Sequence, residues 1–434
     1  MQRLAIVCLG ALLAASAAHA GPHAFTGATL YPISGPPIED GVLLIEGTAI
    51  LAVGPAGEVA IPAGAEVTDV SGRVILPGLV DTHSHLGGPA GGDRSGALHP
   101  GVRVLDAVNV RADEFRRAWA GGITTVNVMP GSGHLMSGQT VYLKLRANPQ
   151  VIDDWLFCDD PVHGICGGMK MANGTNSIRD SRPFPGTRAK SAEMVRTLFR
   201  GALDYRRKKE EAGDDTSKRP ALDLGKEALL QVLDGRRIVH FHTHRHDDVV
   251  TALRLGEELG FTPVLHHVSE AWRVADRIAA AGAPASIIMI DSPGGKLEAV
   301  NLLWQSAPRL EEAGVLTAFH TDDLITDSRL FLRSAGFGVR AGMSREGALH
   351  ALTLAGARML DLDHRVGSLE PGKDADFVIL TGDPLSVYTH VQETWGVGPR
   401  VFPRDDPEQR LWAPGGPGVC RGELAAGHDH GGVR

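Results

Sequence analysis

Histidines separated by a single residue are the feature of this sequence most able to do chemistry. His83 and His85 follow an apolar run, and His240, His242 and His244 alternate in a second segment. Side chains two residues apart on a strand project from the same face, so each set would present its imidazoles together. Two imidazoles on one face make half of a metal site, although a single pair of this kind is also common in ordinary polar packing.

Two further segments offer the remaining ligand types. Residues 265–267 read Leu-His-His, and we expect only one of these imidazoles to face inward, because neighbouring residues of a strand alternate. Residues 319–323 read Phe-His-Thr-Asp-Asp, again with one inward carboxylate expected. At successive strand ends, these groups together favour a metal site over polar packing. Imidazole and carboxylate ligands suit one or two divalent ions, with Zn expected first and Fe, Mn or Ni as alternatives.

Lys170 lies near the end of an expected strand between these segments. A buried lysine is costly unless it is paired or chemically changed. Carbamylation would turn Lys170 into a carboxylate able to bridge two metal ions. The alternative is a lysine that faces solvent or binds an anionic part of a substrate.

The elements that must position these residues alternate between strands and helices. The expected strands of this region are residues 123–128, 237–241, 263–267, 285–289 and 316–320. The expected helices are residues 107–120, 247–259, 270–281, 297–313 and 345–360. The pattern predicts an α/β fold, a (β/α)8 TIM barrel, whose active site would lie at the carboxyl ends of the strands. An open doubly wound sheet is the competitor, but no GxGxxG turn supports it.

The expected domain organisation has five parts. They are a signal peptide at 1–20, a first part of a small β-sandwich at 21–76, the barrel at 77–362, a second part of the β-sandwich at 363–415, and a disordered tail at 416–434. Pro, Gly and charged residues also make the chain from residue 396 onward a poor candidate for regular structure.

The first twenty residues have the features of a secretory signal. Arg3 precedes an apolar run, and Ala18-His-Ala20 fits the pattern of small residues at a cleavage site. An uncleaved membrane anchor is the alternative. We expect an exported protein, periplasmic or extracellular, without membrane association after cleavage, in which Cys158 and Cys166 are either bridged or free.

The composition limits the partners of the chain. The net charge is −8 and only 5% of the residues are aromatic, which argues against a nucleic-acid partner. We expect a small-molecule substrate, and the sequence leaves a homo-oligomer open.

Taken together, the motifs resemble the metal-dependent amidohydrolase superfamily. The segments that carry the resemblance are Gly78-Leu-Val-Asp-Thr-His-Ser-His85, the strand-end His242 and His267, His320-Thr-Asp322, and residues 367–380, which resemble the return of such chains into a β-sandwich. Residues 129–139 and 242–249 are similar to the exported imidazolonepropionase-like group.

The resemblance implies a ligand set and leaves the number of metal ions open. The implied ligands are His83, His85, His242, His267 and Asp322, with support for a carbamylated Lys170 between two metal ions. Residues 172–176 read Ala-Asn-Gly-Thr-Asn, whereas many relatives read Ala-Leu-Gly-Glu-Asn. True imidazolonepropionases use one metal and no lysine, so one or two metals are both retained.

The expected reaction is hydrolysis of a C–N bond in an amide, a cyclic amide or a dipeptide-like molecule. A divalent ion lowers the pKa of its bound water to about 7, and Asp322 would shuttle the proton. His244 and His320 would stabilise a developing oxyanion or orient the ligands. His134 and Gln139, on a Gly-rich segment expected at the mouth, would touch substrate or belong to a plain turn.

Two alternatives use the same residues differently. The total of 19 histidines and the tail sequence His428-Asp-His430 suggest a non-catalytic metal-binding protein. An esterase, a lactonase or a phosphotriesterase would use the same metal chemistry on another electrophile. A serine hydrolase is disfavoured because no GxSxG motif occurs at a strand–helix turn.

Overall fold

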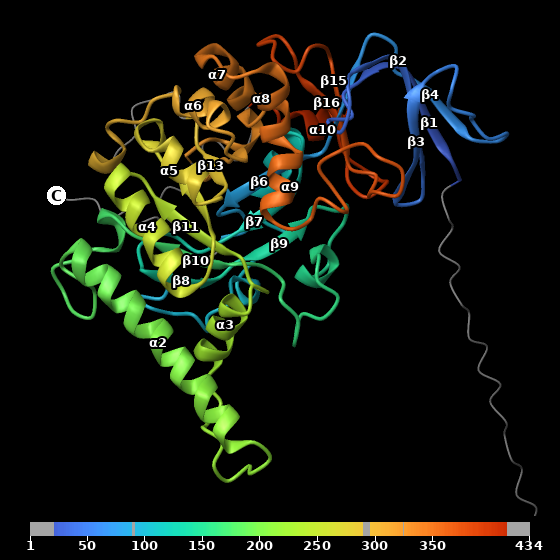
Figure 1. Cartoon of the computed structure of the whole chain (residues 1–434). Coiled ribbons are helices and arrows are strands. Elements are labelled where there is room, and N and C mark those ends of the chain that lie inside the picture. Colours follow the sequence, from blue (N-terminus) through green and yellow to red (C-terminus); the bar gives the residue numbers. More distant parts are fainter. Residues whose placement is uncertain (1–20, 89–91, 290–295, 324, 415–434) are drawn as a thin grey trace, which may run out of the picture.

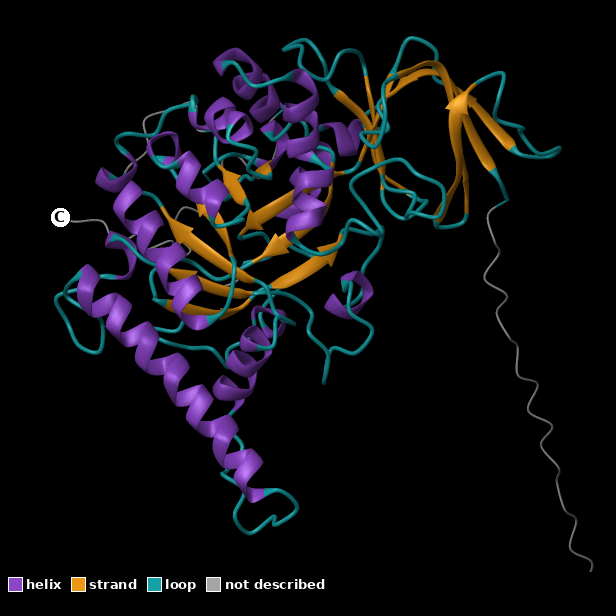
Figure 2. Cartoon of the chain, in the orientation of Figure 1, coloured by secondary structure: helices purple, strands orange, loops and turns teal. Residues whose placement is uncertain are grey.

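The computed structural model describes residues 21–88, 92–289, 296–323 and 325–414. The signal peptide expected at 1–20 and the tail expected at 416–434, with its two histidines, lie outside the described residues. Figure 1 and Figure 2 show a mixed body of helices and strands with a smaller body of strands beside it. The domain boundaries expected from the sequence remain predictions.

The smaller body is one eight-stranded sheet built from both ends of the described chain. Its strands are β1 (His23–Leu30), β2 (Ile38–Glu46), β3 (Ala49–Pro55), β4 (Glu66–Asp69), β5 (Val74–Pro77), β15 (Phe377–Leu380), β16 (Val391–Trp395) and β17 (Arg400–Pro403). Their order is β17-β16-β15-β5-β1-β2-β3, with β4 paired to β1. The antiparallel pairing of β5 with β15 joins the two chain ends.

An apolar cluster holds this sheet together. Phe25 and Phe377 are fully buried, and their rings meet edge to face with centroids 5.0 Å apart.

The expectation that the chain lacks regular structure from residue 396 onward is wrong, because β17 and α10 (Pro407–Arg410) lie in that part.

The larger body contains two sheets. The strands of its first sheet are β6 (Leu79–Ser84), β7 (Ile123–Val128) and β9 (Val141–Lys144). The second sheet has the order β14-β13-β12-β11-β10-β8, formed by β8 (Met136–Gln139), β10 (Met169–Ala172), β11 (Val239–Thr243), β12 (Pro263–His267), β13 (Ala285–Ile287) and β14 (Thr317–Phe319). Strands β10 to β14 are parallel to one another.

The backbone brings the two sheets together at the ends of β6 and β14. The amide of Asp322, just after β14, donates to the carbonyl oxygen of His83 on β6 at 2.9 Å. The ladders of the described residues nevertheless form two sheets and not one closed ring. The α/β class and the parallel strands are therefore present, without the closed barrel that the alternation predicts.

Helices connect and cover these strands. They are α1 (Glu114–Ala120), α2 (Arg188–Ala212), α3 (Leu224–Leu233), α4 (His246–Leu259), α5 (Ala275–Ala280), α6 (Ser306–Glu312), α7 (Arg333–Ala341), α8 (Arg345–Leu352) and α9 (Leu354–Met359). No described helix is both long and apolar enough to cross a bilayer.

Several expected helices are shorter than the sequence predicts. The helix expected over 297–313 is a 3-10 turn, Leu297–Ala299, followed by α6. Pro308 lies in the first turn of α6, where proline is tolerated, whereas in the interior of a helix over 297–313 it would remove a hydrogen bond and kink or break the helix. The helix expected over 345–360 breaks at Thr353, whose φ of −133° and ψ of −96° are not helical.

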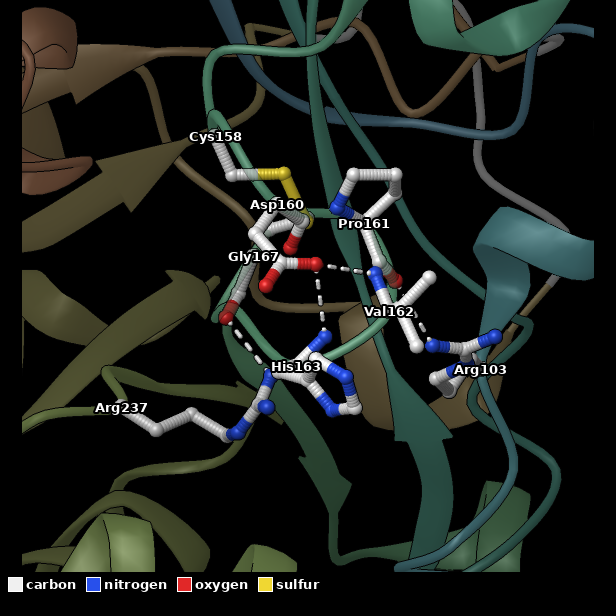
Figure 3. Close-up of a disulfide and its surroundings, with 9 residues drawn as sticks. Arg103, Cys158, Asp160, Pro161, Val162, His163, Gly167 and Arg237 are labelled. Carbon is white, nitrogen blue, oxygen red and sulfur yellow. Dashed lines mark hydrogen bonds between the residues drawn. A yellow bond between two sulfur atoms is a disulfide. The ribbon is translucent and has the colours of Figure 1, made fainter.

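A disulfide braces the segment that leads into β10. Cys158 and Cys166 are bridged, which decides between the two states that the sequence left open (Figure 3). Just after the bridge, the buried side chain of Arg237 donates from Nη1 to the carbonyl oxygen of Gly167 at 2.8 Å. The disulfide and this hydrogen bond therefore hold the start of β10, the strand that carries Lys170.

Candidate metal centre

The ends of β6, β11, β12 and β14 bring buried histidines and one aspartate to a single place. Three groups of side chains have ligand atoms within 4.8 Å of one another: His83 with His267 and His320; His242 with His244 and His267; and His83 with His85 and Asp322. The members shared between groups make them one continuous cluster. All five ligands that the resemblance implies belong to it.

Asp322 is the only carboxylate in these three groups of described residues. Its Oδ1 lies 3.0 Å from His85 Nε2 and 3.5 Å from His83 Nε2. Its Oδ2 lies 3.9 Å from His267 Nδ1. Burial alone would raise the pKa of Asp322, but the hydrogen bond from His85 and the surrounding positive charge hold it well below its usual range. The carboxylate is therefore ionised at neutral pH.

A second buried carboxylate fixes the strand ends that carry these ligands. Asp81 Oδ1 accepts from the amides of His83, at 3.2 Å, and Thr321, at 3.0 Å. Its Oδ2 accepts from the hydroxyl of Thr321 at 2.5 Å. Burial raises the pKa of Asp81 to about 7. Asp81 was not expected as a site residue; its place in β6, two residues before His83, was the available signal.

Both histidines at the end of β12 face the cluster. The ring of His83 lies 4.9 Å from the ring of His266 and 4.6 Å from that of His267, centroid to centroid. The expectation of a single inward imidazole is wrong, because His267 has a φ of +69° and leaves the alternating pleat of the strand.

The three histidines of the β11 segment lie at different depths. His240 is tied into the core, with Nδ1 2.9 Å from His266 Nε2 and Nε2 2.8 Å from the hydroxyl of Tyr142. His242 and His244 both belong to the group that includes His267, so two of the three histidines of this segment reach the cluster.

Lys170, on β10, lies against the cluster and is fully buried. Its Nζ is 3.1 Å from His83 Nε2 and 2.9 Å from the sulfur of Met129. The alternative that Lys170 faces solvent is therefore wrong. Burial lowers the pKa of Lys170 to about 7, so much of it is a neutral amine, the form that carbamylation requires.

The donors fit a divalent metal ion. Four buried ring nitrogens, the Nδ1 atoms of His83 and His242 and the Nε2 atoms of His244 and His267, have no hydrogen-bond partner among the described residues. Burial lowers the pKa of all four imidazoles, so they are uncharged and keep a lone pair. Neutral imidazole with ionised carboxylate is the form that metal ligation needs.

Known proteins share this architecture. A family profile described as "Amidohydrolase family" matches residues 226–402. The solved structure of an amidohydrolase from Thermotoga maritima superimposes with a TM-score of 0.81 at 31% identity, and the match covers 88% of this chain and 100% of that one. The chain belongs to the amidohydrolase family. It is accordingly a hydrolase, and the superfamily resemblance of its motifs is confirmed.

Curated relatives of this amidohydrolase carry several names. The imidazolonepropionase of Salinispora tropica is 28% identical over 79% of this chain and 86% of its own length. Amidohydrolase tasK of Hapsidospora irregularis is 27% identical over 81% of this chain, but the match spans only 38% of that longer protein.

His320 and His244 differ in the hydrogen bonds of their rings. In this amidohydrolase both nitrogens of His320 are engaged, Nδ1 at 2.8 Å from Ser286 Oγ and Nε2 at 3.0 Å from His267 Nδ1. His244 engages only Nδ1, at 2.8 Å from Ser269 Oγ. His320 is therefore placed to orient His267, whereas His244 keeps one nitrogen for another partner.

The two expected substrate residues lie apart from these contacts. Gln139 donates from Nε2 to the carbonyl oxygen of Pro100 at 3.1 Å, which ties β8 to the preceding segment. His134 is buried between His99 and Phe184, with ring centroids 5.6 and 5.4 Å away. Contact of either residue with substrate remains a prediction.

Proposed function

We propose that this amidohydrolase is an exported, metal-dependent enzyme that hydrolyses a C–N bond in an amide, a cyclic amide or a dipeptide-like molecule. The observation that carries the proposal is the ionised Asp322, held 3.0 Å from His85 within one buried cluster of imidazoles. The names of the relatives support hydrolysis of small molecules.

The residues that would hold one or two divalent ions are His83, His85, His242, His267 and Asp322. Zn is the first candidate, with Fe, Mn and Ni as alternatives. A bound ion would supply Lewis acidity and make water reactive near neutral pH. Lys170, neutral in part and 3.1 Å from His83, would complete a two-metal site if it is carbamylated.

Side chains of the cluster would transfer the proton of the attacking water and stabilise the developing charge. Asp322 is ionised and can accept the proton of the attacking water, then return it to the leaving nitrogen, which departs poorly unless protonated. If His244 Nδ1 accepts from Ser269 Oγ, the proton of this neutral imidazole lies on Nε2, which would donate it to the developing oxyanion. His320 orients His267 through its Nε2 contact at 3.0 Å.

The test combines metal analysis with a substrate screen. Purified protein would be analysed for bound metal and tested against N-acyl amino acids, dipeptides and cyclic amides, with esters, lactones and phosphotriesters as the alternative substrates. Turnover of C–N substrates that falls in proportion to metal removal supports the proposal. Fully metallated protein that turns over no C–N substrate contradicts it.

The metal-binding alternative has a separate test. His83→Ala removes a ligand shared by two groups of the cluster, so the bound metal should fall to background in mass-spectrometric analysis. Deletion of residues 423–434 should leave the metal content unchanged. The opposite pattern would favour a storage protein with its site in the tail.

We propose that export places the enzyme in the periplasm or outside the cell. The apolar run after Arg3 and the Cys158–Cys166 bridge support an oxidising compartment. Fractionation of a Gram-negative host should recover protein that begins at Gly21, whereas Leu12→Arg with Leu13→Arg should retain it in the cytoplasm. Recovery of wild-type protein with residues 1–20 still attached, in the membrane fraction, would favour an uncleaved anchor.

We also propose that the two sheets of the larger body close into a (β/α)8 barrel. The contact between Asp322 N and His83 O, at 2.9 Å, supports this closure at one seam. A crystal structure of the metal-loaded enzyme would test it, and two separate sheets in that structure would contradict it.

A further inference from the structure

Lys296 lies beside the histidine cluster, and its side chain is held by an amide. With the side-chain amide of Asn176 turned so that its oxygen faces donors, that oxygen accepts from Lys296 Nζ at 3.0 Å. The same oxygen accepts from His242 Nε2 at 3.3 Å and from Ser132 Oγ at 2.7 Å. Among the described residues, no carboxylate lies within 4.0 Å of Lys296 Nζ. One amide thus links Lys296 to an expected metal ligand, His242.

Several hydrogen bonds hold the segment that carries Lys296 in place. Glu298, two residues later, is buried, and its Oε2 accepts from the amide of Thr175 at 2.7 Å. Its Oε1 accepts from the turned amide of Asn176 at 3.3 Å. Farther along, Asn301 Nδ2 donates to Glu270 Oε1 at 2.6 Å. The segment that carries Lys296 is therefore docked onto the loops after β10 and β12.

The loop after β10 is shaped to receive this segment. Gly174 has a φ of +76°, and a Cβ there would lie only 2.4 Å from Glu298 Oε2. The stretch 172–176 that contains this glycine also supplies the Thr175 amide and the Asn176 side chain that contact Glu298. A side chain larger than glycine at 174 would therefore disturb the docking of the Lys296 segment.

The positive charge of Lys296 affects the pKa values of groups in the cluster. Burial and the positive charges of Lys296 and other neighbours lower the pKa of His244 to about 3. The same ammonium contributes to the low pKa of Asp322. Because no described residue forms an ion pair with Lys296, its side chain can still receive an anion from the substrate.

We propose that Lys296 binds the carboxylate of the substrate, so that N-acyl amino acids and dipeptides are preferred to neutral amides. The inference rests on the proposed C–N hydrolysis and narrows its substrate class. A charge-assisted hydrogen bond is roughly twice as strong as a neutral one. We therefore expect at least about a ten-fold preference in kcat/KM for a carboxylate over the matched primary amide.

The kinetic test compares matched substrates and matched lysine variants. N-acetyl amino acids and their N-acetyl amino acid amides would be assayed with wild type, Lys296→Met and Lys296→Arg. Lys218→Met, at a lysine paired with Asp215 on the surface, is the control. Lys296→Met should remove the preference mainly by raising KM for the acid, Lys296→Arg should keep most of it, and the control should match wild type. An equal loss on acid and amide would overturn the assignment.

The second readout is binding without turnover. Calorimetry of metal-stripped protein with N-acetylglycine and N-acetylglycinamide separates Lys296 from the attraction of a metal for carboxylate. Wild type should bind the acid at least ten-fold more tightly, and Lys296→Met should bind both equally. Equal binding by wild type overturns the inference even if amides are hydrolysed. If the acid is preferred and no amide is hydrolysed, the proposed reaction fails and the binding role of Lys296 stands.

Discussion

At the scale of single residues, Asp322 differs from its neighbour Asp323 in every contact. Asp322 meets His85 at 3.0 Å, whereas Asp323 lies 3.7 Å from Arg117 and accepts from the amide of Ser328 at 3.0 Å. Two adjacent buried carboxylates thus belong to different environments, one to the imidazole cluster and one to the packing of the loop. This contrast provides a matched pair of variants.

Asp322→Asn should lower kcat by about 10²- to 10⁴-fold, because it removes the expected acid and base while keeping the side-chain shape. Asp323→Asn should lower the midpoint of thermal unfolding but keep kcat near wild type. Turnover measured with metal content fixed by mass spectrometry would check both. An active Asp322→Asn enzyme would place the proton shuttle on another residue.

Much of the site could be predicted from residue types and spacing. The alternation of His83 with His85, and His242 at the end of its strand, pointed to the residues that now lie together. The backbone turns were not readable from the pattern: His267 at φ +69° and Asp322 at φ +48° leave the regular strand geometry on which the expectation of alternation rested. Lys296 was missed because it contacts Asn176, a residue of another loop that is distant in the sequence.

At the scale of elements, the strands matched their expected ranges better than the helices. Strands β7 and β12 occupy the ranges predicted from their apolar residues. Only the end of helix α2 was expected, because the charged residues 206–219 indicate a solvated helix end and loop. The buried Val195, Phe199 and Ala202, which recur at helical spacing, were the signal for the rest of it. The break at Thr353, where the backbone leaves the helical region, was not predicted from the spacing of apolar residues.

The loop after β10 should be sensitive to a single methyl group. Gly174→Ala places a Cβ 2.4 Å from Glu298 Oε2 on a backbone with φ +76°, so we expect a loss of about 2–3 kcal/mol in the free energy of unfolding. Gly213→Ala, at φ +50° and ψ −124° with open space around it, carries the backbone strain alone and should cost about 1–2 kcal/mol, less than Gly174→Ala. Urea denaturation would compare them, and equal costs would show that Glu298 moves aside freely.

The disulfide should stabilise the segment before β10. Replacing Cys158 and Cys166 by serine opens a loop with a sequence separation of 8, which should lower the free energy of unfolding by about 2–3 kcal/mol. Denaturation with and without a reductant would check this, since the reductant should act on wild type and not on the double variant. A wild type indifferent to the reductant would contradict the expectation.

At the scale of the whole molecule, a buried lysine joins the two bodies. Lys144 on β9 is fully buried and lies 2.7 Å from Asp374, and it also contacts Asp376 beside β15. Burial would raise the pKa of Asp374, but the charges of Lys144 and Arg365 lower it overall. The fully buried Asp376 keeps a raised pKa, because burial outweighs the same lysine.

Lys144→Met should lower the free energy of unfolding at pH 7 by about 3–5 kcal/mol, because it leaves buried carboxylates without their cation. The stabilisation due to the depressed pKa of Asp374 is present above its unfolded pKa of about 4 and is lost as the pH falls through the lower folded value. The variant should therefore show a weaker loss of stability below pH 4 in denaturation curves. An unchanged pH profile would mean that Arg365 alone holds Asp374.

The projecting end of α2 is a suitable site for attaching a label or a support to the enzyme. Figure 1 shows this helix extending away from the strands that carry the cluster, and residues 213–219 at its tip are exposed. None of the residues assigned to chemistry lies there. A fluorophore or a solid support coupled to this tip would leave the histidine cluster untouched, so the immobilised enzyme should keep its turnover.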